Sequence, residues 1–175
     1  MSLILLPKQE IEFFYGPFHP LSQWYTSFFD IDGIRFNSAE QWMMYAKAML
    51  FGDNETANKI LVSDSPSIQR KLGRQVKYFK EGLWIDQRES IIYYGNYEKF
   101  TQNTDLRTYL LKTGINILAE ASPTDIIWGI GLAIDNNDRF NTEKWRGQNL
   151  LGKILMKVRE DLSKEDSQKE ITLIK

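Results

Sequence analysis

The helix that organises this chain begins in the stretch Phe36-Asn37-Ser38-Ala39-Glu40-Gln41-Trp42-Met43-Met44-Tyr45-Ala46-Lys47. The side chain of Ser38 can accept a hydrogen bond from the first turn of a helix, and Gln41, three residues later, can complete a capping box. Apolar residues then recur at helical spacing, so the pattern predicts a helix over residues 39–51. The rest of the chain is expected to pack around it.

The faces of this helix separate core residues from a narrow border. The residues expected to face the core are Ala39, Trp42, Met43, Ala46, Met49 and Leu50. Glu40, Met44 and Lys47 form a stripe along the edge of that face, with Glu40 and Lys47 two turns apart, roughly 10 Å along the axis. An acid and an amine in this position suit the wall of a cleft, but two solvated surface charges would show the same pattern.

Composition limits the chemistry that the chain can carry. Its 175 residues fit one domain with its own core, and a formal net charge of −1 supplies no general attraction for nucleic acid. The absence of cysteine excludes disulfides, and with His19 as the single histidine a transition-metal site is not expected. The chain has neither a long apolar run for a membrane span nor a signal peptide, so a cytoplasmic protein is expected.

Turn and capping signals divide the remaining chain into short elements. Strands are expected near residues 11–15, 28–36 and 115–120, with a type I′ hairpin at Asp32-Gly33. Helices are expected over residues 54–62, capped by Asn54, and over residues 66–73, 83–100, 104–112 and 149–162. The predicted fold class is α+β: one mostly helical domain (11–162) with a small antiparallel sheet, an N-terminal extension (1–10) and a charged, frayed C-terminal tail (163–175).

Basic residues are concentrated between positions 70 and 80, with no acidic residue among them. The five are Arg70, Lys71, Arg74, Lys77 and Lys80. Such a group can cradle a phosphate, and a solvated basic surface would look the same. Glycine-marked turns at residues 128–131 and 145–152 match neither a dinucleotide-binding fingerprint nor a P-loop.

Many motifs of this chain occur together in one order, which makes the combination specific. They are Leu21-Ser22, Ser38-Ala39-Glu40-Gln41-Trp42, Ala46-Lys47, Ser65-Pro66, Leu72-Gly73-Arg74, Trp84, Lys99-Phe100, Leu106-Arg107, Leu118-Ala119-Glu120-Ala121-Ser122-Pro123, Asp125, Trp128-Gly129-Ile130-Gly131 and Trp145-Arg146-Gly147-Gln148-Asn149-Leu150-Leu151-Gly152. Over about residues 12–162 the series resembles the NADAR family, also called YbiA-like. The chain departs from the usual pattern at Gln23-Trp24, where Asn-Phe is common, and at Gln41-Trp42, where a histidine is common. Residue 41 is therefore not expected to act as a base.

The resemblance implies an N-glycosidase, a hydrolase that cleaves ribose–nitrogen bonds. It leaves two substrate classes open: phosphoribosylated aminopyrimidine intermediates of riboflavin biosynthesis, and ADP-ribose linked to guanine, including guanine in nucleic acid. In both, a phosphorylated ribose is joined through its anomeric carbon to nitrogen. No cofactor, metal, membrane or protein partner is expected.

Several residues fit that chemistry, which builds positive charge on the sugar and requires protonation of the leaving nitrogen. Glu40 and Asp125 can supply a carboxylate and an acid. The resemblance implies that Lys47 is catalytic, with Schiff-base capture of the ring-opened ribose aldehyde as a possible route. The residues expected to bind substrate are Ser22, Arg74, Trp84, Trp128, Gly129 and Asn149. Arg74 would hold phosphate, and the tryptophans would stack on a flat base. Tyr15 and Gly16, which follow the first expected strand, are weaker candidates for substrate binding.

Two other functions compete with this one. The first is a non-catalytic module that binds ADP-ribose or a nucleotide, and the second is an interaction domain whose aromatic residues only form its core. The presence of both Glu40 and Lys47 favours catalysis, because a binding module needs phosphate and base contacts but no acid–amine pair. The polar loop of residues 133–144 is expected to form the rim of the site.

Overall fold

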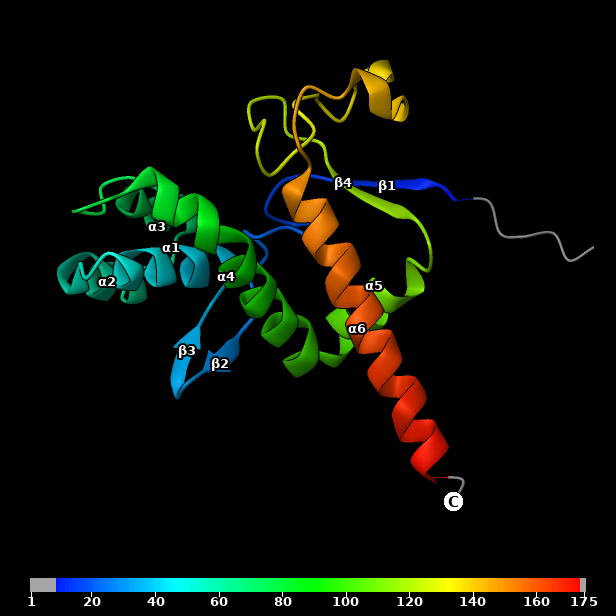
Figure 1. The fold of residues 1–175 in the computed structure, drawn as a ribbon, viewed down its shortest axis with the longest axis horizontal. Coiled ribbons are helices and arrows are strands. Elements are labelled where there is room, and N and C mark those ends of the chain that lie inside the picture. Colours follow the sequence, from blue (N-terminus) through cyan, green and yellow to red (C-terminus); the bar gives the residue numbers. More distant parts are fainter. Residues whose placement is uncertain (1–8, 174–175) are drawn as a thin grey trace, which may run out of the picture.

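The computed structural model describes residues 9–173, which contain six α-helices and four short strands (Figure 1). The strands are β1 (Ile11–Phe14), β2 (Phe29–Ile31), β3 (Ile34–Phe36) and β4 (Ile117–Glu120). The helices are α1 (Ala39–Leu50), α2 (Asn54–Leu61), α3 (Pro66–Gly73), α4 (Glu81–Gln102), α5 (Thr104–Lys112) and α6 (Leu150–Leu173). The prediction of one mostly helical α+β domain is confirmed. Most of the expected N-terminal extension, residues 1–8, and the last two residues of the tail lie outside the described part.

The start of α1 follows the capping prediction and adds a longer-range contact. The Ser38 hydroxyl accepts from the backbone N–H of Gln41 at 3.1 Å. The Gln41 side-chain oxygen accepts from the backbone N–H of Asn37 at 2.7 Å, one residue earlier than in a capping box. Its amide nitrogen meanwhile donates to the carbonyls of Ile60, Leu61 and Ser63. Gln41 thereby fastens the beginning of α1 to the end of α2.

The predicted core face of α1 is displaced toward its expected border. Glu40 is only 3% exposed and Met44 is buried, whereas Met49, predicted to face the core, is 45% exposed. The reason is that α3 packs against the border side of α1: a Cβ at Gly73 would lie 1.9 Å from the Met44 sulfur. The border stripe of Glu40, Met44 and Lys47 is therefore an interior surface between two helices, and not the edge of a solvated face.

Two other helix ends differ from the prediction. The cap of α2 is Asp53, whose carboxylate accepts from the backbone N–H of Thr56 at 3.1 Å, and not Asn54. The last helix continues to Leu173, so the expected fraying after residue 162 is wrong for the tail up to that residue. The tail is held because its acidic residues have partners: Arg107 donates to Asp166 at 2.6 Å, and the Tyr97 hydroxyl donates to Glu165.

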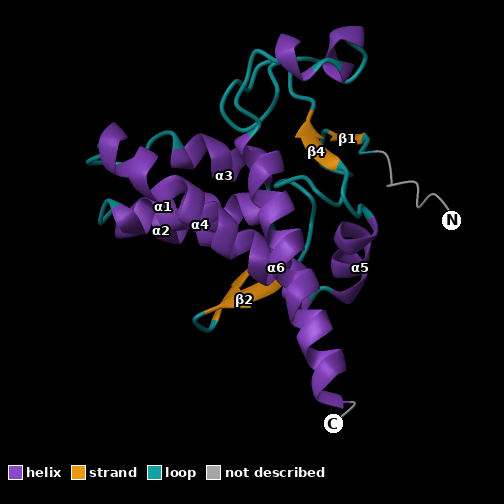
Figure 2. Ribbon diagram, turned by 45° about the vertical axis from the view of Figure 1, so that its right-hand side comes forward, coloured by secondary structure: helices purple, strands orange, loops and turns teal. Residues whose placement is uncertain are grey.

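The strands form two separate pairs, and not one antiparallel sheet as predicted. Strands β2 and β3 make the expected hairpin, in which Asp32 and Gly33 have φ values of 51° and 79°. Strand β1 pairs with β4 in parallel, with Phe14 opposite Glu120. A parallel pair needs a long crossover, and here helices α1 to α5 supply it. Figure 2 shows the two strand pairs at separate places on the helical body.

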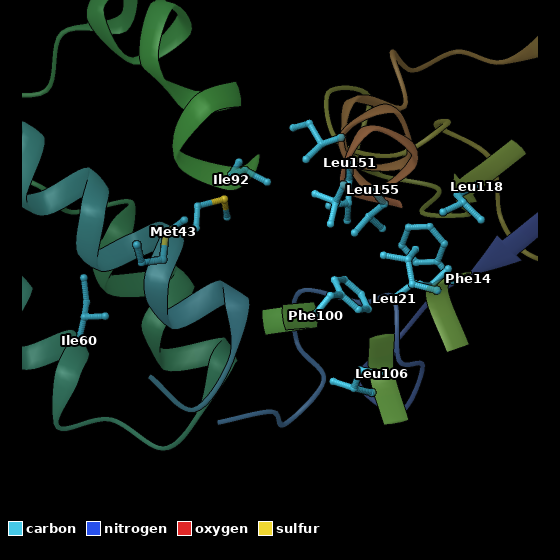
Figure 3. Close-up of a cluster of buried hydrophobic side chains, with 14 of the residues drawn as sticks. Phe14, Leu21, Met43, Ile60, Ile92, Phe100, Leu106, Leu118, Leu151 and Leu155 are labelled. Atoms are coloured by element: carbon cyan, nitrogen blue, oxygen red, sulfur yellow. The ribbon is translucent and has the colours of Figure 1, made fainter. Parts of the chain in front are cut away.

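The core extends from the helices to the loop that follows β1, which we call the aromatic loop (residues 15–24). Figure 3 shows the labelled members of the main buried cluster: Phe14, Leu21, Met43, Ile60, Ile92, Phe100, Leu106, Leu118, Leu151 and Leu155. Leu21 belongs to the aromatic loop and is completely buried in this cluster. The loop is therefore anchored in the core at this residue. Of the helices described, none is both long and apolar enough to cross a bilayer.

Candidate active site

A cavity of about 510 Å³ lies where the aromatic loop, α1, α3 and the first part of α4 meet the segment after β4. Figure 1 shows these elements, which are far apart in the sequence, on the same part of the molecule. The predicted site residues that line the cavity are Ser22, Glu40, Lys47, Arg74, Trp84, Asp125 and Trp128. A cavity of this size, with polar groups from several elements, is typical of a small-molecule site.

Glu40 is the most deeply buried acidic group of the cavity. Burial raises the pKa of its carboxyl to about 8, the nearby Arg70 opposes that rise, and Glu120 and Asp125 add to it. One carboxyl oxygen, Oε1, is buried with no hydrogen-bond partner among the described residues. A buried polar atom without a protein partner is rare, and in a cavity wall it indicates a group that acts on a ligand.

Glu120 supplies a second, half-buried carboxyl to the same cavity, and it was not among the predicted site residues. Burial, aided by the charge of Asp125, raises its pKa to about 7, while Arg70 acts against the rise. Its Oε2 is also buried without a partner in the described part of the chain. The available signal was its place at the carboxyl end of β4, because ligands bind beyond that end of parallel strands. The signal was missed because the parallel pairing with β1 was not recognised.

Asp125 lies in the turn after β4, and both oxygens of its carboxylate have neighbours that hold the side chain in one position. Its Oδ1 accepts from the backbone N–H groups of Ile127 and Trp128, at 3.0 and 2.8 Å. Its Oδ2 lies 3.9 Å from a guanidinium nitrogen of Arg70. Asp125 therefore fixes the turn that carries Trp128 and orients Arg70 at the cavity.

Lys47 lies two helical turns from Glu40 along the same wall. Its ammonium donates to the carbonyl of Gly73 at 2.8 Å and lies 4.5 and 5.5 Å from the ring centres of Phe79 and Trp84. Burial, and next the charge of Arg74, lower the pKa of this lysine. A lysine with a lowered pKa is more often an uncharged amine, the form that attacks carbonyl carbon.

The basic residues between positions 70 and 80 divide into two groups. Arg70 and Arg74, four residues apart near the end of α3, both line the cavity. Lys77 instead forms an ion pair with Glu55 at 2.8 Å, and Lys71 and Lys80 are exposed residues outside the cavity lining. Two arginines of the predicted phosphate-binding group thus line the cavity, whereas its three lysines lie on the exposed surface.

Two predicted binding residues support the wall instead of lining the cavity. Asn149 is 2% exposed; its amide donates to the Leu118 carbonyl at 2.8 Å and accepts from the backbone N–H of Glu120 at 3.2 Å. The backbone N–H of Asn149 donates to the carbonyl of Gly129 at 3.0 Å, and a Cβ at Gly129 would lie 2.8 Å from the Glu120 carbonyl oxygen. Both residues are therefore placed to hold Glu120, and direct contact with substrate is not what their positions favour.

The rim differs from the prediction as well. Among the residues described, the cavity lining includes Tyr15 and Gly16 of the aromatic loop but no residue of the 133–144 loop. That loop packs elsewhere: the Arg139 guanidinium lies 5.2 and 4.2 Å from the ring centres of Phe13 and Phe140. Ser22 lines the cavity, and its hydroxyl accepts from the backbone N–H of Trp24 at 3.1 Å.

Comparison with known proteins places this arrangement in a family. The family model described as the NADAR domain matches residues 13–163. N-glycosidase R617 of Acanthamoeba polyphaga mimivirus is 43% identical over 148 residues, which are 82% of this chain and 87% of that protein. The riboflavin biosynthesis protein VVA0006 of Vibrio vulnificus is 32% identical over 81% of this chain, a match that spans 35% of its own length.

The fold also has a known counterpart. The NMR structure of the Escherichia coli protein YbiA matches with a TM-score of 0.75, covering 94% of this chain and 91% of that one, at 24% sequence identity. The sequence of N-glycosidase YbiA from the same organism is 28% identical over 151 residues, or 86% of this chain and 84% of that protein. On these matches, and with its motifs gathered around one cavity, the chain belongs to the NADAR domain family.

Proposed function

We propose that this chain is an N-glycosidase that hydrolyses the bond between a phosphorylated ribose and the nitrogen of a base or amine. The observation that carries the proposal is the pair of carboxyls of Glu40 and Glu120, in a cavity that also holds Lys47 and two arginines. Each carboxyl has one buried oxygen with no partner among the described residues. The names of the relatives R617 and YbiA support the reaction class. The name of the Vibrio relative supports a substrate from riboflavin biosynthesis.

The two carboxyls can divide the proton transfers of the reaction. When the bond to the anomeric carbon breaks, the nitrogen leaves with the bonding electron pair and needs a proton. Glu40, with a pKa of about 8, carries a proton at neutral pH and can give it to that nitrogen. Water adds its oxygen to the anomeric carbon and gives a proton to a carboxylate, for which Glu120, with a pKa of about 7, is suited. The products are a phosphorylated ribose and the free base.

Lys47 offers a second route to the same products. When the ribose ring opens, the anomeric carbon stays joined to the nitrogen of the base or amine as an iminium. The Lys47 amine can add to that carbon, and the nitrogen of the base then leaves with a proton, so that a Schiff base between the sugar and Lys47 replaces the bond to the base. Hydrolysis of the Schiff base returns the aldehyde and the amine. Its lowered pKa, set mainly by burial, favours the uncharged amine that this step requires.

The remaining residues of the cavity can hold the two ends of such a substrate. Arg70 and Arg74 can bind the phosphate, since a guanidinium donates two parallel hydrogen bonds to its oxygens. Trp84 and Trp128 can stack on the flat base. A binding module for ADP-ribose would use the same arginines and tryptophans, but it would need no pair of carboxyls whose buried oxygens have no partner among the described residues.

The test is to assay the purified protein on both substrate classes side by side. One substrate is a phosphoribosylated aminopyrimidine and the other is ADP-ribosylated guanosine, and release of the aminopyrimidine or of guanosine is measured. We expect turnover of at least one. If the reaction passes through Lys47, turnover should fall by about 10²–10⁴-fold in the Lys47→Ala variant, whereas the carboxyl route predicts a much smaller loss. Lys71→Ala, which removes an exposed lysine of α3 outside the cavity lining, is the matched control and should keep full turnover.

Borohydride then separates the two routes. Added during turnover, it should attach the sugar covalently to Lys47 if the Schiff base forms, and to no residue in Lys47→Ala. Calorimetric binding of ADP-ribose by the wild type, with no base released from either substrate, would make the chain a binding module and would overturn the proposed hydrolysis.

A further inference from the structure

Gln23 is a buried residue of the cavity wall to which neither the motifs nor the proposed reaction gives a role. It lies in the aromatic loop, is 8% exposed, and lines the cavity. Its backbone carbonyl accepts from the N–H of Glu40 at 2.9 Å, which joins the loop to the start of α1. Its side-chain amide nitrogen donates to the Asn96 side-chain oxygen at 3.0 Å. Both its backbone and its side chain are therefore fixed.

Helix α4 supplies the fixed points for this part of the loop. Asn96 and Lys99 are three residues apart, so they share one face of α4, and both are completely buried. The Lys99 ammonium donates to the carbonyls of Pro20 and Ser22 at 2.8 and 2.9 Å. The backbone before Gln23 is held by Lys99 and the side chain of Gln23 by Asn96, which leaves the amide little freedom to move.

The hydrogen bonds also determine which way the Gln23 amide faces. The Asn96 amide nitrogen donates to the backbone carbonyl of Ile92 at 2.8 Å, and a carbonyl can only accept. Asn96 must therefore present its oxygen to Gln23, and Gln23 must present its NH₂ group to Asn96. The Oε1 atom of Gln23 is then the atom of the amide that does not bond to Asn96, and it is buried with no partner among the described residues.

We propose that Gln23 is a specificity-determining residue, whose Oε1, oriented by Asn96, accepts a hydrogen bond from a neutral donor group of the substrate. An amide oxygen can accept but cannot donate, so it selects a hydroxyl or an N–H group and disfavours a phosphate or carboxylate oxygen. The inference rests on the proposed function and refines it: the arginines receive the anionic end of the ligand, and Gln23 receives an uncharged donor. That donor is either a ribose hydroxyl or an amine of the base.

An acceptor fixed in this way discriminates strongly, because a ligand without the donor leaves the buried oxygen unpaired. The discrimination depends on orientation as well as on chemistry. A glutamine freed from Asn96 could turn its NH₂ group to the ligand, so Asn96 is a positioning residue for Gln23.

The experiment compares kcat/KM for the parent substrate with three analogues: the 2′-deoxy and 3′-deoxy sugars, and a base whose exocyclic amine is replaced by hydrogen. We expect the wild type to lose about 10–100-fold on the analogue that lacks the recognised donor. Gln23→Met has no acceptor at this position. Its kcat/KM for the parent substrate should fall by a similar factor, and its kcat/KM values for that analogue and for the parent should be equal. Loss of discrimination on a deoxy sugar identifies a hydroxyl as the donor, and loss on the base analogue identifies the amine.

Two further variants keep the test decisive. Gln23→Asn keeps the amide but draws the oxygen back by one methylene, so it should show the same trend if Gln23→Met does not fold. Gln87→Met makes the same chemical change on an exposed position of α4 and should behave as the wild type. If the folded Gln23 variants keep the wild-type ratio of kcat/KM between the parent substrate and each of the three analogues, Gln23 does not determine specificity and the inference is overturned.

Failure of the proposed hydrolysis would look different. If the wild type turns over no parent substrate, the proposed hydrolysis is wrong, and Kd values replace the kinetic ratios. The sugar ligands are then ribose 5-phosphate and its 2-deoxy and 3-deoxy forms. The base ligands are the free base and its deaminated analogue. If the wild type binds the ligand with all its donor groups more tightly than the analogue that lacks one, and Gln23→Met does not, the proposed role of Gln23 in specificity would still be supported. Equal preferences in the two proteins would overturn it.

Discussion

Two buried ionisable side chains, Glu40 and Lys99, contact the aromatic loop and differ in how their polar atoms are satisfied. Glu40 donates its backbone N–H to the loop at Gln23, and its carboxyl interacts with the side chain of Trp24, but its Oε1 has no partner among the described residues. Lys99 places its ammonium between two loop carbonyls, those of Pro20 and Ser22, and donates to both. Burial shifts both groups toward their uncharged forms: it raises the pKa of Glu40 to about 8 and lowers the pKa of Lys99 to about 7.

The difference is the one expected between a group that supports the fold and a group that acts on a ligand. An uncharged lysine amine still has two N–H groups, so Lys99 can keep both of its hydrogen bonds after losing its charge. Glu40 retains an oxygen that no group of the described residues satisfies, which is unfavourable for stability and suits contact with a ligand. We therefore expect changes at Glu40 to affect turnover and changes at Lys99 to affect the fold.

The largest expected effect is on turnover by Glu40→Gln. This variant keeps the shape of the side chain but cannot deliver a proton, so kcat should fall by about 10²–10⁴-fold. Its melting temperature should stay at or above that of the wild type, because a neutral amide replaces an acid that is costly to ionise in this site. Steady-state kinetics and thermal melting of the same preparation measure both. A large loss of stability, with turnover unchanged, would make Glu40 a structural residue like Lys99.

The next effect is on stability by Lys99→Met. Methionine fills a similar volume but donates nothing, so the carbonyls of Pro20 and Ser22 lose their donor. We expect the free energy of unfolding to fall by about 1–3 kcal/mol, since the lost hydrogen bonds outweigh the relief of burying an amine. Denaturant unfolding measures the change. A Lys99→Met protein with wild-type stability and severely reduced kcat would instead place Lys99 in the chemistry.

The dependence of stability on pH should have opposite signs for the two groups. Between its unfolded pKa of about 4.5 and its folded pKa of about 8, Glu40 keeps a proton only in the folded state, so its contribution to stability falls as pH rises through this window. Between a folded pKa of about 7 and an unfolded pKa of about 10.5, Lys99 keeps a proton only in the unfolded state, so its contribution rises with pH.

The variants isolate these two contributions from all other titrations. The stability of Glu40→Gln relative to the wild type should increase from about pH 4.5 to pH 8, and the deficit of Lys99→Met should grow from about pH 7 to pH 10. Each slope is limited to about 1.4 kcal/mol per pH unit, the value for one proton. Urea unfolding at a series of pH values gives the slopes, and two parallel, flat difference curves would show that neither group changes its pKa on folding.

The contrast also shows which parts of the molecule can be predicted from the sequence. The cap at Ser38 and the hairpin at Asp32-Gly33 depend on neighbouring residues, and both were predicted correctly. Glu120 could not be placed by local chemistry, because its burial depends on β1 and β4 pairing in parallel across about 100 residues of chain. The burial of Glu40 likewise depends on where α3 packs against α1, and the apolar periodicity of α1 alone does not predict that position.

Lys99 and Gln23 illustrate the same limit for single residues. A lysine inside the 22-residue helix α4 gives no signal that distinguishes it from a solvated lysine. Its function appears only when the aromatic loop folds back onto that helix. Gln23 is informative only because Asn96, more than seventy positions away, fixes its amide.

The smallest expected effect is at Lys77, an exposed lysine whose ammonium also has a partner. Its ammonium donates to Glu55 at 2.8 Å, a hydrogen bond as short as those of Lys99, but both side chains are more than half exposed. Water satisfies either group when the other is removed, and salt screens the pair. Lys77→Met should therefore cause no measurable fall in melting temperature and no change in kcat. Thermal melting of this variant beside Lys99→Met compares the same substitution with and without burial. An equal loss in the two proteins would mean that the hydrogen bonds, and not the burial of their acceptors, account for the contribution of Lys99.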